Sequence, residues 1–404
     1  MKILWVSNAP HSPTGYGNQT QVNVPRLKAL GHEMSVTAFY GLQGAPSNWN
    51  GVLVLPASQN PYGNDVIVAD ATHVQADIVI TLMDVWVLAT EVMQQVAWYP
   101  WLPVDHDPAP PAVLDALKAA RRPICYAQFG VRKLREAGLD PLYVPHSVDR
   151  GVYKPLDRAE SREALGFKEG EFVVGLVAAN KGAPSRKAFD QQIRAFAEFQ
   201  RRHKDAVLYL HTDMLGMQGE NLRRIIELAG LPKEAVVEVP SYRYARGFIP
   251  WPWMAQAYNT FDVLLHATRG EGFGLTIIEA QACGCPVIVT DFSAMPELVT
   301  DGLGWKVGFS DKFFSQDSYQ VIPSVPEIVD ALEQAYARRG DADLRAAVAR
   351  SMDAYDADHV AEAHWKPVLA EIEQEIRGVR ERAQTARLNR KERRRLLHDQ
   401  RAKV

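Results

Sequence analysis

Residues 269–298 read RGEGFGLTIIEAQACGCPVIVTDFSAMPEL, and this stretch decides the fold of the chain. An apolar run at 262–266 precedes it and predicts a short buried strand. Within it, 275–283 have a helical pattern, and the apolar run at 286–290 predicts the next strand. A strand–loop–helix–strand order is typical of a parallel α/β sheet. The N-terminus of the helix, with its free N–H groups and partial positive charge, then faces whatever occupies the loop.

Two glutamates, Glu271 and Glu279, lie on either side of this loop. Between them, Gly272 and Gly274 allow the backbone to approach a ligand closely. We expect Glu271 to face that ligand from the loop, and Glu279 to face it from the helix about one turn further in. Solvated glutamates that favour the helix dipole are the alternative. The paired glycines and the flanking strands favour a binding site.

The segment from Asp262 to Val299 resembles the retaining glycosyltransferases of family 4. These enzymes have the GT-B fold, an α/β architecture of two Rossmann-like doubly wound domains facing each other across a cleft. The resemblance is specific in the C-terminal half and weaker toward the N-terminus. It implies that Glu271 lies beside the hydroxyls of the donor sugar and that Glu279 binds the ribose of the nucleotide. It also implies that N–H groups near the sugar and diphosphate come from Gly272, Phe273, Gly274 and Leu275.

The reaction implied by this resemblance is transfer of a sugar from a nucleoside-diphosphate sugar, above all a UDP- or GDP-sugar, to an acceptor hydroxyl. The anomeric configuration is retained. Cations and helix N–H groups stabilise the charge that grows on the leaving diphosphate, so no metal or cofactor is expected. The acceptor stays open between a sugar, a lipid, a protein and a modified nucleic acid. The alternatives are a GT-B nucleotide-sugar epimerase, a phosphorylase, or a non-catalytic module that holds a sugar or polymer.

Strand and helix patterns alternate through the first half of the chain, which favours a parallel, doubly wound sheet. The turn-rich stretch 149–155 resembles the family's connector between domains. We therefore expect an N-terminal acceptor-side domain at 1–150 and a C-terminal nucleotide-sugar domain at 151–358. A helix at 359–376 is expected to cross back onto the N-terminal domain, and 377–404 form a basic tail.

A glycine-rich loop at 13–19 stands between the first expected strand and a helix expected at 18–30. Gly15 and Gly17 can present backbone N–H groups to a phosphate or a sugar. The resemblance places this loop across the cleft from the donor diphosphate. Asn18 beside them is a candidate acceptor contact. A tight turn, which also calls for glycine, is the alternative.

Residues 180–187, NKGAPSRK, follow the first expected strand of the second domain. Ligands bind at the carboxyl ends of such strands, and the family commonly places an arginine and a later lysine here to clamp the diphosphate. Lys187 matches the lysine by its position before the next helix. Gly182 stands where the arginine is expected, so Lys181 and Arg186 are both candidates for the second cation. Solvated loop cations are the alternative.

The run PVDHDP at 103–108 follows an expected strand of the first domain. Related enzymes often have a histidine at a strand end that faces the donor sugar, and His106 is the candidate here. Asp105 is a candidate acceptor contact, and a turn with local Asx hydrogen bonds is the alternative. His146 and His266 also stand at strand ends and are the other candidates for the histidine.

The composition is that of an ordinary globular protein, because 47% of the 404 residues are hydrophobic and 23% are charged. A chain of this length can bury two cores. It has no apolar run long enough to span a bilayer, and its N-terminus is too short and polar for a signal peptide. Cys125, Cys283 and Cys285 are expected to be buried reduced thiols, which favours a cytoplasmic location.

From Arg377 onward the chain contains eleven basic and three acidic residues, a net charge of +8, which leaves −11 on the rest of a chain of net charge −3. A solvated helix or arm is the plain interpretation. Attraction to an acidic partner is the alternative: nucleic acid, an acidic protein, or a membrane surface that would make the location peripheral. The tail has no aromatic residue, so base stacking is not expected there.

Overall fold

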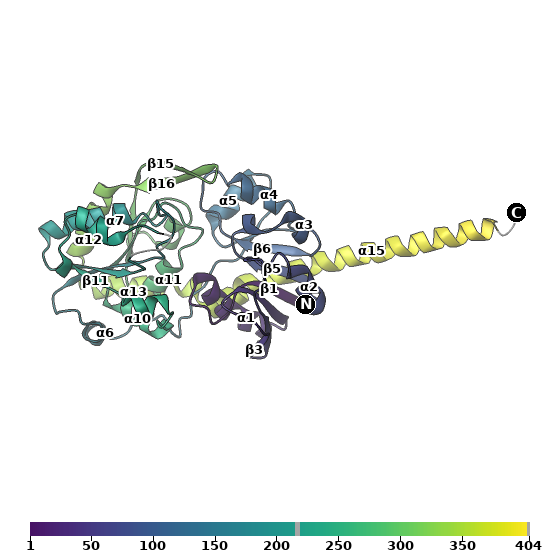
Figure 1. Ribbon diagram of the computed structural model, residues 1–404, viewed down its shortest axis with the longest axis horizontal. Helices are drawn as coiled ribbons and strands as arrows, with labels where there is room; N and C mark the ends of the chain where they lie inside the picture. Colours follow the sequence, from purple (N-terminus) through teal and green to yellow (C-terminus); the bar gives the residue numbers. More distant parts are fainter. Residues whose placement is uncertain (215–218, 402–404) are drawn as a thin grey trace.

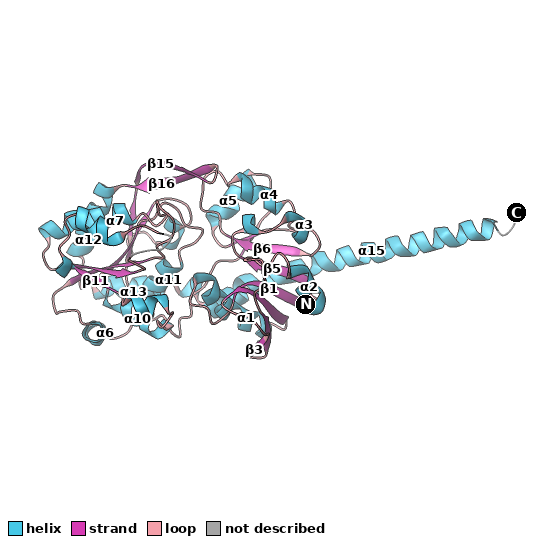
Figure 2. Ribbon diagram, viewed as in Figure 1, coloured by secondary structure: helices cyan, strands magenta, loops and turns pink. Residues whose placement is uncertain are grey.

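The structure, a computed structural model, describes residues 1–214 and 219–401, with side chains described through Arg382 and at Thr385. Figure 1 shows two lobes side by side and a long C-terminal helix that extends away from the N-terminal lobe. In Figure 2 each lobe has a central sheet with helices around it. The α/β class expected from the sequence is therefore confirmed.

The N-terminal domain is built on an eight-stranded sheet with the order β3-β4-β2-β1-β5-β6-β7-β8. Its strands pair in parallel except for the edge pair β3–β4. Along β1, Ile3 and Trp5 join one apolar cluster and Leu4 and Val6 join another, so both faces of the sheet are covered. The strands are β1 (Lys2–Asn8), β2 (Glu33–Tyr40), β3 (Ser47–Trp49), β4 (Val52–Leu55), β5 (Ile78–Leu82), β6 (Trp98–Leu102), β7 (Ile124–Cys125) and β8 (Leu142–Tyr143). The helices are α1 (Gly15–Ala29), α2 (Ile67–His73), η1 (Val85–Val87), α3 (Thr90–Met93), α4 (Pro111–Leu117) and α5 (Gln128–Glu136).

The C-terminal domain has a six-stranded parallel sheet with the order β11-β10-β9-β12-β13-β14. Every residue of its central strand β9 is buried, because apolar side chains cover both faces of the sheet. The strands are β9 (Phe172–Val177), β10 (Ala206–His211), β11 (Val236–Glu238), β12 (Val263–His266), β13 (Val287–Thr290) and β14 (Trp305–Val307), and a separate hairpin consists of β15 (Phe309–Ser315) and β16 (Ser318–Pro323). The helices are α6 (Arg158–Leu165), α7 (Phe189–Arg202), α8 (Leu222–Leu228), η2 (Lys233–Ala235), α9 (Ser241–Ala245), α10 (Trp251–Thr260), α11 (Leu275–Ala282), η3 (Met295–Leu298), α12 (Val325–Ala337), α13 (Ala342–Ser351) and η4 (Asp353–Tyr355).

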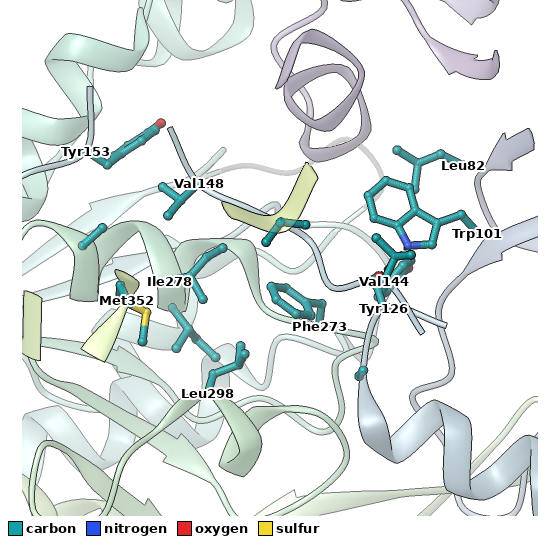
Figure 3. Close-up of a cluster of buried hydrophobic side chains, with 14 of the residues drawn as sticks. Leu82, Trp101, Tyr126, Val144, Val148, Tyr153, Phe273, Ile278, Leu298 and Met352 are labelled. Carbon is teal, nitrogen blue, oxygen red and sulfur yellow. Dashed lines mark hydrogen bonds between the residues drawn. The ribbon is translucent and has the colours of Figure 1, made fainter. Parts of the chain in front are cut away.

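One apolar cluster runs across both domains. Figure 3 shows Tyr126 of the N-terminal domain and Phe273 of the C-terminal domain in this cluster, and their rings meet edge-on with centroids 6.2 Å apart. The two domains therefore share part of their core. Cys125, Cys283 and Cys285 are free and buried, as the sequence predicts.

The hairpin β15–β16 is an element that the sequence patterns do not predict. It reaches from the C-terminal domain toward the N-terminal domain (Figure 1), where the N–H of Asp107 donates to the carbonyl of Tyr319 at 2.9 Å. Gln320 Nε2 donates to Asp105 Oδ2 at 3.3 Å. The hairpin thereby holds the 103–108 turn at the domain interface.

The segment after the C-terminal domain returns to the N-terminal domain. Trp365 is fully buried, its Nε1 donates to Asn23 Oδ1 at 2.8 Å, and its ring centroid lies 5.0 Å from that of Trp101. Further along, Arg122 Nη1 donates to Glu375 at 2.7 Å. These contacts anchor the C-terminal segment on the N-terminal sheet. The segment consists of α14 (Ala357–Val360), the π-helical turn η5 (Ala361–Trp365) and α15 (Lys366–Arg401).

Replacing Trp365 by alanine should destabilise the protein by about 3–5 kcal/mol, because the variant lacks a buried indole and its hydrogen bond. Chemical denaturation measures the free energy of unfolding. The control is Glu362→Ala on the exposed face of the same turn, which should change this free energy by less than about 1 kcal/mol. Equal effects of the two substitutions would contradict the anchoring role of Trp365.

Helix α15 continues well past the N-terminal domain (Figure 1). Most basic side chains of the tail fall beyond Thr385, outside the described residues, so an acidic partner for the tail stays a prediction. Within the described part of the chain, no helix combines the length and the apolar character that crossing a membrane requires.

Candidate active site

A cavity of about 500 Å³ lies between the domains, at the carboxyl ends of strands from both sheets. Ligands bind at this position in doubly wound folds. The N-terminal wall consists of Gly15, Tyr16, Asp84, Val85, Trp86, Pro103, Val104, Asp105, Pro110, Val113, Tyr126 and His146. The C-terminal wall consists of Val177, Ala178, Ala179, Arg186, Lys187, His266, residues 271–276 and Gln316.

Glu271 forms the centre of an ion cluster on the C-terminal wall. Its Oε1 accepts a hydrogen bond from Lys187 Nζ at 2.6 Å, and its Oε2 accepts one from Arg186 Nη1 at 2.7 Å. His266 Nε2 lies 3.2 Å from the same Oε1, and the N–H of Glu271 donates to Ser293 Oγ at 2.9 Å. Both carboxylate oxygens of Glu271 therefore accept hydrogen bonds. Of the two candidates for the second cation, Lys181 and Arg186, it is Arg186 that joins Lys187 at Glu271.

The charge of this cluster follows from burial and from its pairs. Burial by itself would raise the pKa of Glu271, but Arg186 and Lys187 hold this pKa well below its usual range. Burial lowers the pKa of His266, although Glu271 opposes the shift, so the ring is neutral at neutral pH. Glu271 thus pairs with two cations, and Arg186 Nε also lies 3.8 Å from Asp105 Oδ2. Two adjacent cations at this wall suit a diphosphate.

Helix α11 begins directly after the loop that carries Glu271, so its N-terminus lies at the cavity. Gly274 is the N-cap and has a φ of 118°, which favours glycine. A Cβ on Gly272 would lie 2.4 Å from Pro103 Cβ of the opposite domain. The N–H of Ile277 donates to the carbonyl of Gly274 at 3.0 Å, whereas the N–H groups at the very start of a helix, here those of Leu275 and Thr276, have no partner within it. The two glycines therefore allow this donor-rich end to meet the N-terminal wall closely.

Glu279 lies on α11 but is not part of the cavity wall. Its Oε2 accepts a hydrogen bond from the Tyr258 hydroxyl at 2.8 Å. Burial raises the pKa of Glu279 to about 7, although this hydrogen bond opposes the shift. The ribose-binding role implied for Glu279 stays a prediction.

The raised pKa of Glu279 predicts a pH dependence of stability. The folded protein keeps this proton up to about pH 7, whereas an unperturbed carboxyl loses it near 4.5. Between these values the folded state binds more protons, so the free energy of unfolding should fall as pH rises from about 4.5 to about 7. Glu279→Gln should lack this component, which is up to about 3 kcal/mol. Urea denaturation of both proteins at pH 5 and pH 8 measures it, and equal pH responses would contradict the assignment.

The residues of the N-terminal wall that were not among the sequence candidates include Tyr16, Asp84 and Trp86. Asp84 follows β5, a strand whose residues are all buried. A polar residue shortly after a buried strand is the signal in the sequence that could have identified Asp84 as a site residue. Burial, and then the charge of Asp105, raise the pKa of Asp84 to about 6, while Arg186 opposes the shift. Asp84 is therefore mostly ionised at neutral pH.

Of the three candidate histidines, His146 and His266 line the cavity and His106 does not. His106 is buried beneath the turn, with its Nδ1 2.6 Å from Asp105 Oδ1. His146 stacks on Tyr126 with ring centroids 4.0 Å apart, and burial lowers its pKa well below the usual range. The cavity therefore presents the two neutral rings that were the alternatives to His106.

The glycine-rich stretch is helical rather than a loop. Thr14 is the N-cap of α1, its Oγ1 accepts from the N–H of Gly17 at 3.0 Å, and the helix begins at Gly15, earlier than the sequence pattern indicates. Gly15 lines the cavity, and a Cβ there would lie 3.2 Å from Leu275 Cδ1 across the interface. Gly17 is outside the cavity wall. A Cβ on Gly17 would lie 2.2 Å from the carbonyl oxygen of Ser12, so this glycine serves packing.

Asn18 and Lys181 also lie outside the cavity wall. Asn18 Oδ1 accepts a hydrogen bond from Trp251 Nε1 at 3.1 Å, which joins the two domains. Lys181 is exposed, and no hydrogen bond or ion pair of its side chain occurs in the described part of the chain. Asn18 is thus committed to an interdomain contact, and Lys181 is separate from the cluster around Glu271.

In comparison with known proteins, residues 171–337 match the family described as Glycosyl transferases group 1. The chain is 32% identical over 164 residues to the D-inositol 3-phosphate glycosyltransferase of Actinosynnema mirum, covering 40% of this chain and 38% of that protein. It is 33% identical over 165 residues to the enzyme of the same name from Nocardia farcinica, covering 39% and 34%. The match thus spans little more than a third of the length of these relatives.

Similarity to solved structures extends over nearly the whole chain. The sucrose-phosphate synthase of Thermosynechococcus elongatus superposes with a TM-score of 0.68 at 16% identity, covering 94% of this chain and 99% of that one. HepE of Anabaena in complex with UDP-glucose superposes with a TM-score of 0.65 at 17% identity, covering 92% and 100%. Residues 171–337 therefore match a group 1 glycosyltransferase domain, and the two domains together have the GT-B fold.

Proposed function

We propose that the protein is a retaining glycosyltransferase that moves a sugar from a nucleoside-diphosphate sugar to an acceptor hydroxyl without a metal ion. The observation that carries the proposal is the cluster of Arg186, Lys187 and Glu271 beside the N-terminus of α11, inside the interdomain cavity. The group 1 domain and the UDP-glucose bound by the structural neighbour HepE support a nucleotide-sugar donor.

The cluster provides the charge that such a reaction needs. Glu271 forms salt bridges with both Arg186 and Lys187. When a donor binds, the diphosphate oxygens compete with Glu271 for Arg186 and Lys187, and arginine can bind two phosphate oxygens at once. As the glycosidic bond breaks, negative charge grows on the leaving diphosphate and these cations stabilise it most. They neutralise the diphosphate as a metal ion would, which is the basis for proposing metal independence.

We propose retention from the resemblance to the retaining family 4 enzymes. In this mechanism no side chain attacks the sugar, and the role of Glu271 is to pair with Arg186 and Lys187. The acceptor hydroxyl attacks from the face on which the diphosphate departs. The bond from the anomeric carbon to the acceptor oxygen forms as the bond to the diphosphate oxygen breaks. The departing phosphate oxygen takes the hydroxyl proton, and the anomeric configuration is kept.

A panel of nucleotide sugars tests the proposal: UDP-glucose, UDP-N-acetylglucosamine, GDP-mannose and ADP-glucose. At least one should raise the melting temperature of the full chain, because a ligand at about 100 times its Kd stabilises the folded state by about 2.7 kcal/mol. That donor should give a glycoside of unchanged anomeric configuration by NMR, with equal rates with and without EDTA. No stabilisation by any of the four, or an inverted product, would refute the proposal.

A further inference from the structure

The two walls of the cavity carry opposite charge. Arg186 and Lys187 are both on the C-terminal wall, where they pair with Glu271. The N-terminal wall contains Asp84 and Asp105 and no lysine or arginine. Its one histidine, His146, is neutral because burial lowers its pKa. The side of the cavity opposite the proposed donor site is therefore acidic.

Of the two carboxylates on the N-terminal wall, Asp105 is already engaged. Its Oδ1 lies 2.6 Å from His106 Nδ1, and its Oδ2 accepts from Gln320 Nε2 at 3.3 Å. The same Oδ2 lies 3.8 Å from Arg186 Nε, so Asp105 spans the interface. These contacts fix Asp105 as part of the cavity frame. The carboxylate that is left to meet a ligand is Asp84.

Among the described residues, Asp84 faces the cavity without a salt bridge, and the cation that acts on it is Arg186 of the opposite wall, which opposes the rise in its pKa. In the described part of the chain no ion pair and no hydrogen bond to another residue involves its carboxylate. It stands two residues after β5, a strand whose residues are all buried, so its backbone has a defined position at the cavity. An ionised carboxylate can only accept hydrogen bonds. Its natural partner in the cavity is therefore a ligand that donates O–H groups.

An apolar surface lies beside Asp84. The Trp86 side chain lines the cavity and is 49% exposed, which is unusual for so large an apolar group. Pro110 and Val113, at the start of α4, line the same wall. Small-molecule sites commonly combine an aromatic or apolar surface with a few fixed polar groups. Here the polar group is Asp84.

We propose that Asp84 and Trp86 form the acceptor subsite, and that the acceptor is an unphosphorylated polyhydroxyl compound such as a sugar or cyclitol. Its hydroxyls donate to Asp84, and the C–H face of its ring packs against Trp86. A phosphate group would meet two carboxylates and no cation on this wall, which is a repulsive arrangement that selects against phosphorylated acceptors. The proposal rests on the proposed glycosyltransferase function.

Matched pairs of acceptors test this selectivity with the full chain and the donor chosen by the nucleotide-sugar panel. The pairs are glucose with glucose 6-phosphate and myo-inositol with myo-inositol 1-phosphate. For each pair in which at least one compound accepts the sugar, kcat/KM should be at least about tenfold higher for the unphosphorylated member. A preference for the phosphorylated members, or no transfer to either unphosphorylated compound, would overturn the proposal.

Substitution of Asp84 tests the residue itself. Asp84→Asn should raise the acceptor KM by about 10- to 100-fold, the usual effect of removing a hydrogen bond to a charged group. It should leave unchanged the rise in melting temperature caused by the nucleoside diphosphate, which also shows that the variant folds. The control is Glu91→Gln, an exposed acid of the same domain that is not part of the cavity wall, and its acceptor KM should equal that of the wild type.

A charge reversal gives a second measurement. Asp84→Lys places a cation on the acidic wall and should shift the preference within each pair toward the phosphorylated member. An acceptor KM in Asp84→Asn equal to that of the control, or no change of preference in Asp84→Lys, would overturn the assignment of Asp84. If none of the four nucleotide sugars stabilises the wild type, the proposed function itself fails. If one of them does and only the acceptor tests fail, the assignment of Asp84 alone is wrong.

Discussion

Glu271→Gln should reduce sugar transfer by about 10²–10³-fold while nucleoside diphosphate still binds. The substitution keeps the shape of the side chain but removes the charge that holds Arg186 and Lys187. Because the buried cations lose their partner, the protein without ligand should be destabilised by about 3 kcal/mol. The diphosphate no longer competes with a carboxylate for these cations. It should therefore raise the melting temperature of the variant at least as much as that of the wild type.

Two measurements separate these effects, a transfer assay at saturating donor and a thermal shift with the nucleoside diphosphate alone. Glu234→Gln is the matched control, because Glu234 is an exposed acid of the same domain outside the cavity wall. It should behave as the wild type in both assays. Transfer by Glu271→Gln at the wild-type rate would show that Glu271 has no role in the transfer.

Lys187→Ala is expected to have the second large effect on activity. Unlike Glu271→Gln, it should also weaken the binding of the nucleoside diphosphate. Lys187 Nζ is one of the two cations proposed to bind the diphosphate. Its removal should lower kcat/KM by about 10²–10³-fold and the affinity for nucleoside diphosphate by about 10- to 100-fold. Binding should weaken equally for the diphosphate and for the complete donor, because both ligands contain the diphosphate group that Lys187 binds. Titration calorimetry with both ligands measures this equality.

Lys181→Ala is the control for Lys187→Ala, since both lysines belong to the same loop and Lys181 is exposed. Its affinity for the diphosphate should be that of the wild type. Equal decreases of affinity in the two variants would mean that the loop acts only through its overall charge. A decrease confined to Lys187→Ala would support a direct contact with the diphosphate.

The C-terminal domain was predictable from the sequence because its signals are local. The apolar run of β9, the amphipathic pattern of α7 and the paired glycines before α11 are each contained in a short segment. The helix expected at 275–283 is α11, which spans Leu275–Ala282. The group 1 family match falls on the same region. Strand periodicity and glycine conformation are properties of short segments, so one sequence is enough to read them.

The site was only partly predictable. Glu271 was predicted from the 269–298 stretch and Lys187 from the 180–187 loop, and their side chains meet although they are 84 residues apart in sequence. The choice between Arg186 and Lys181 as the second cation could not be made from spacing, because the loop between them has no periodic pattern. His106 was favoured because related enzymes often have a histidine at a strand end that faces the donor sugar, yet its side chain is buried and lies 2.6 Å from Asp105 Oδ1.

The sequence by itself determined the α/β class, the two-domain organisation of the fold and the acids of the 269–298 stretch. Only the tertiary structure decided which side chains share the cavity: Arg186 rather than Lys181, and Asp84 as the unpaired carboxylate opposite them. The physical reason is that a helix or strand depends on neighbours a few residues away. The cavity instead depends on how two sheets and the β15–β16 hairpin pack together, and contacts such as that of Gln320 with Asp105 join residues 215 positions apart.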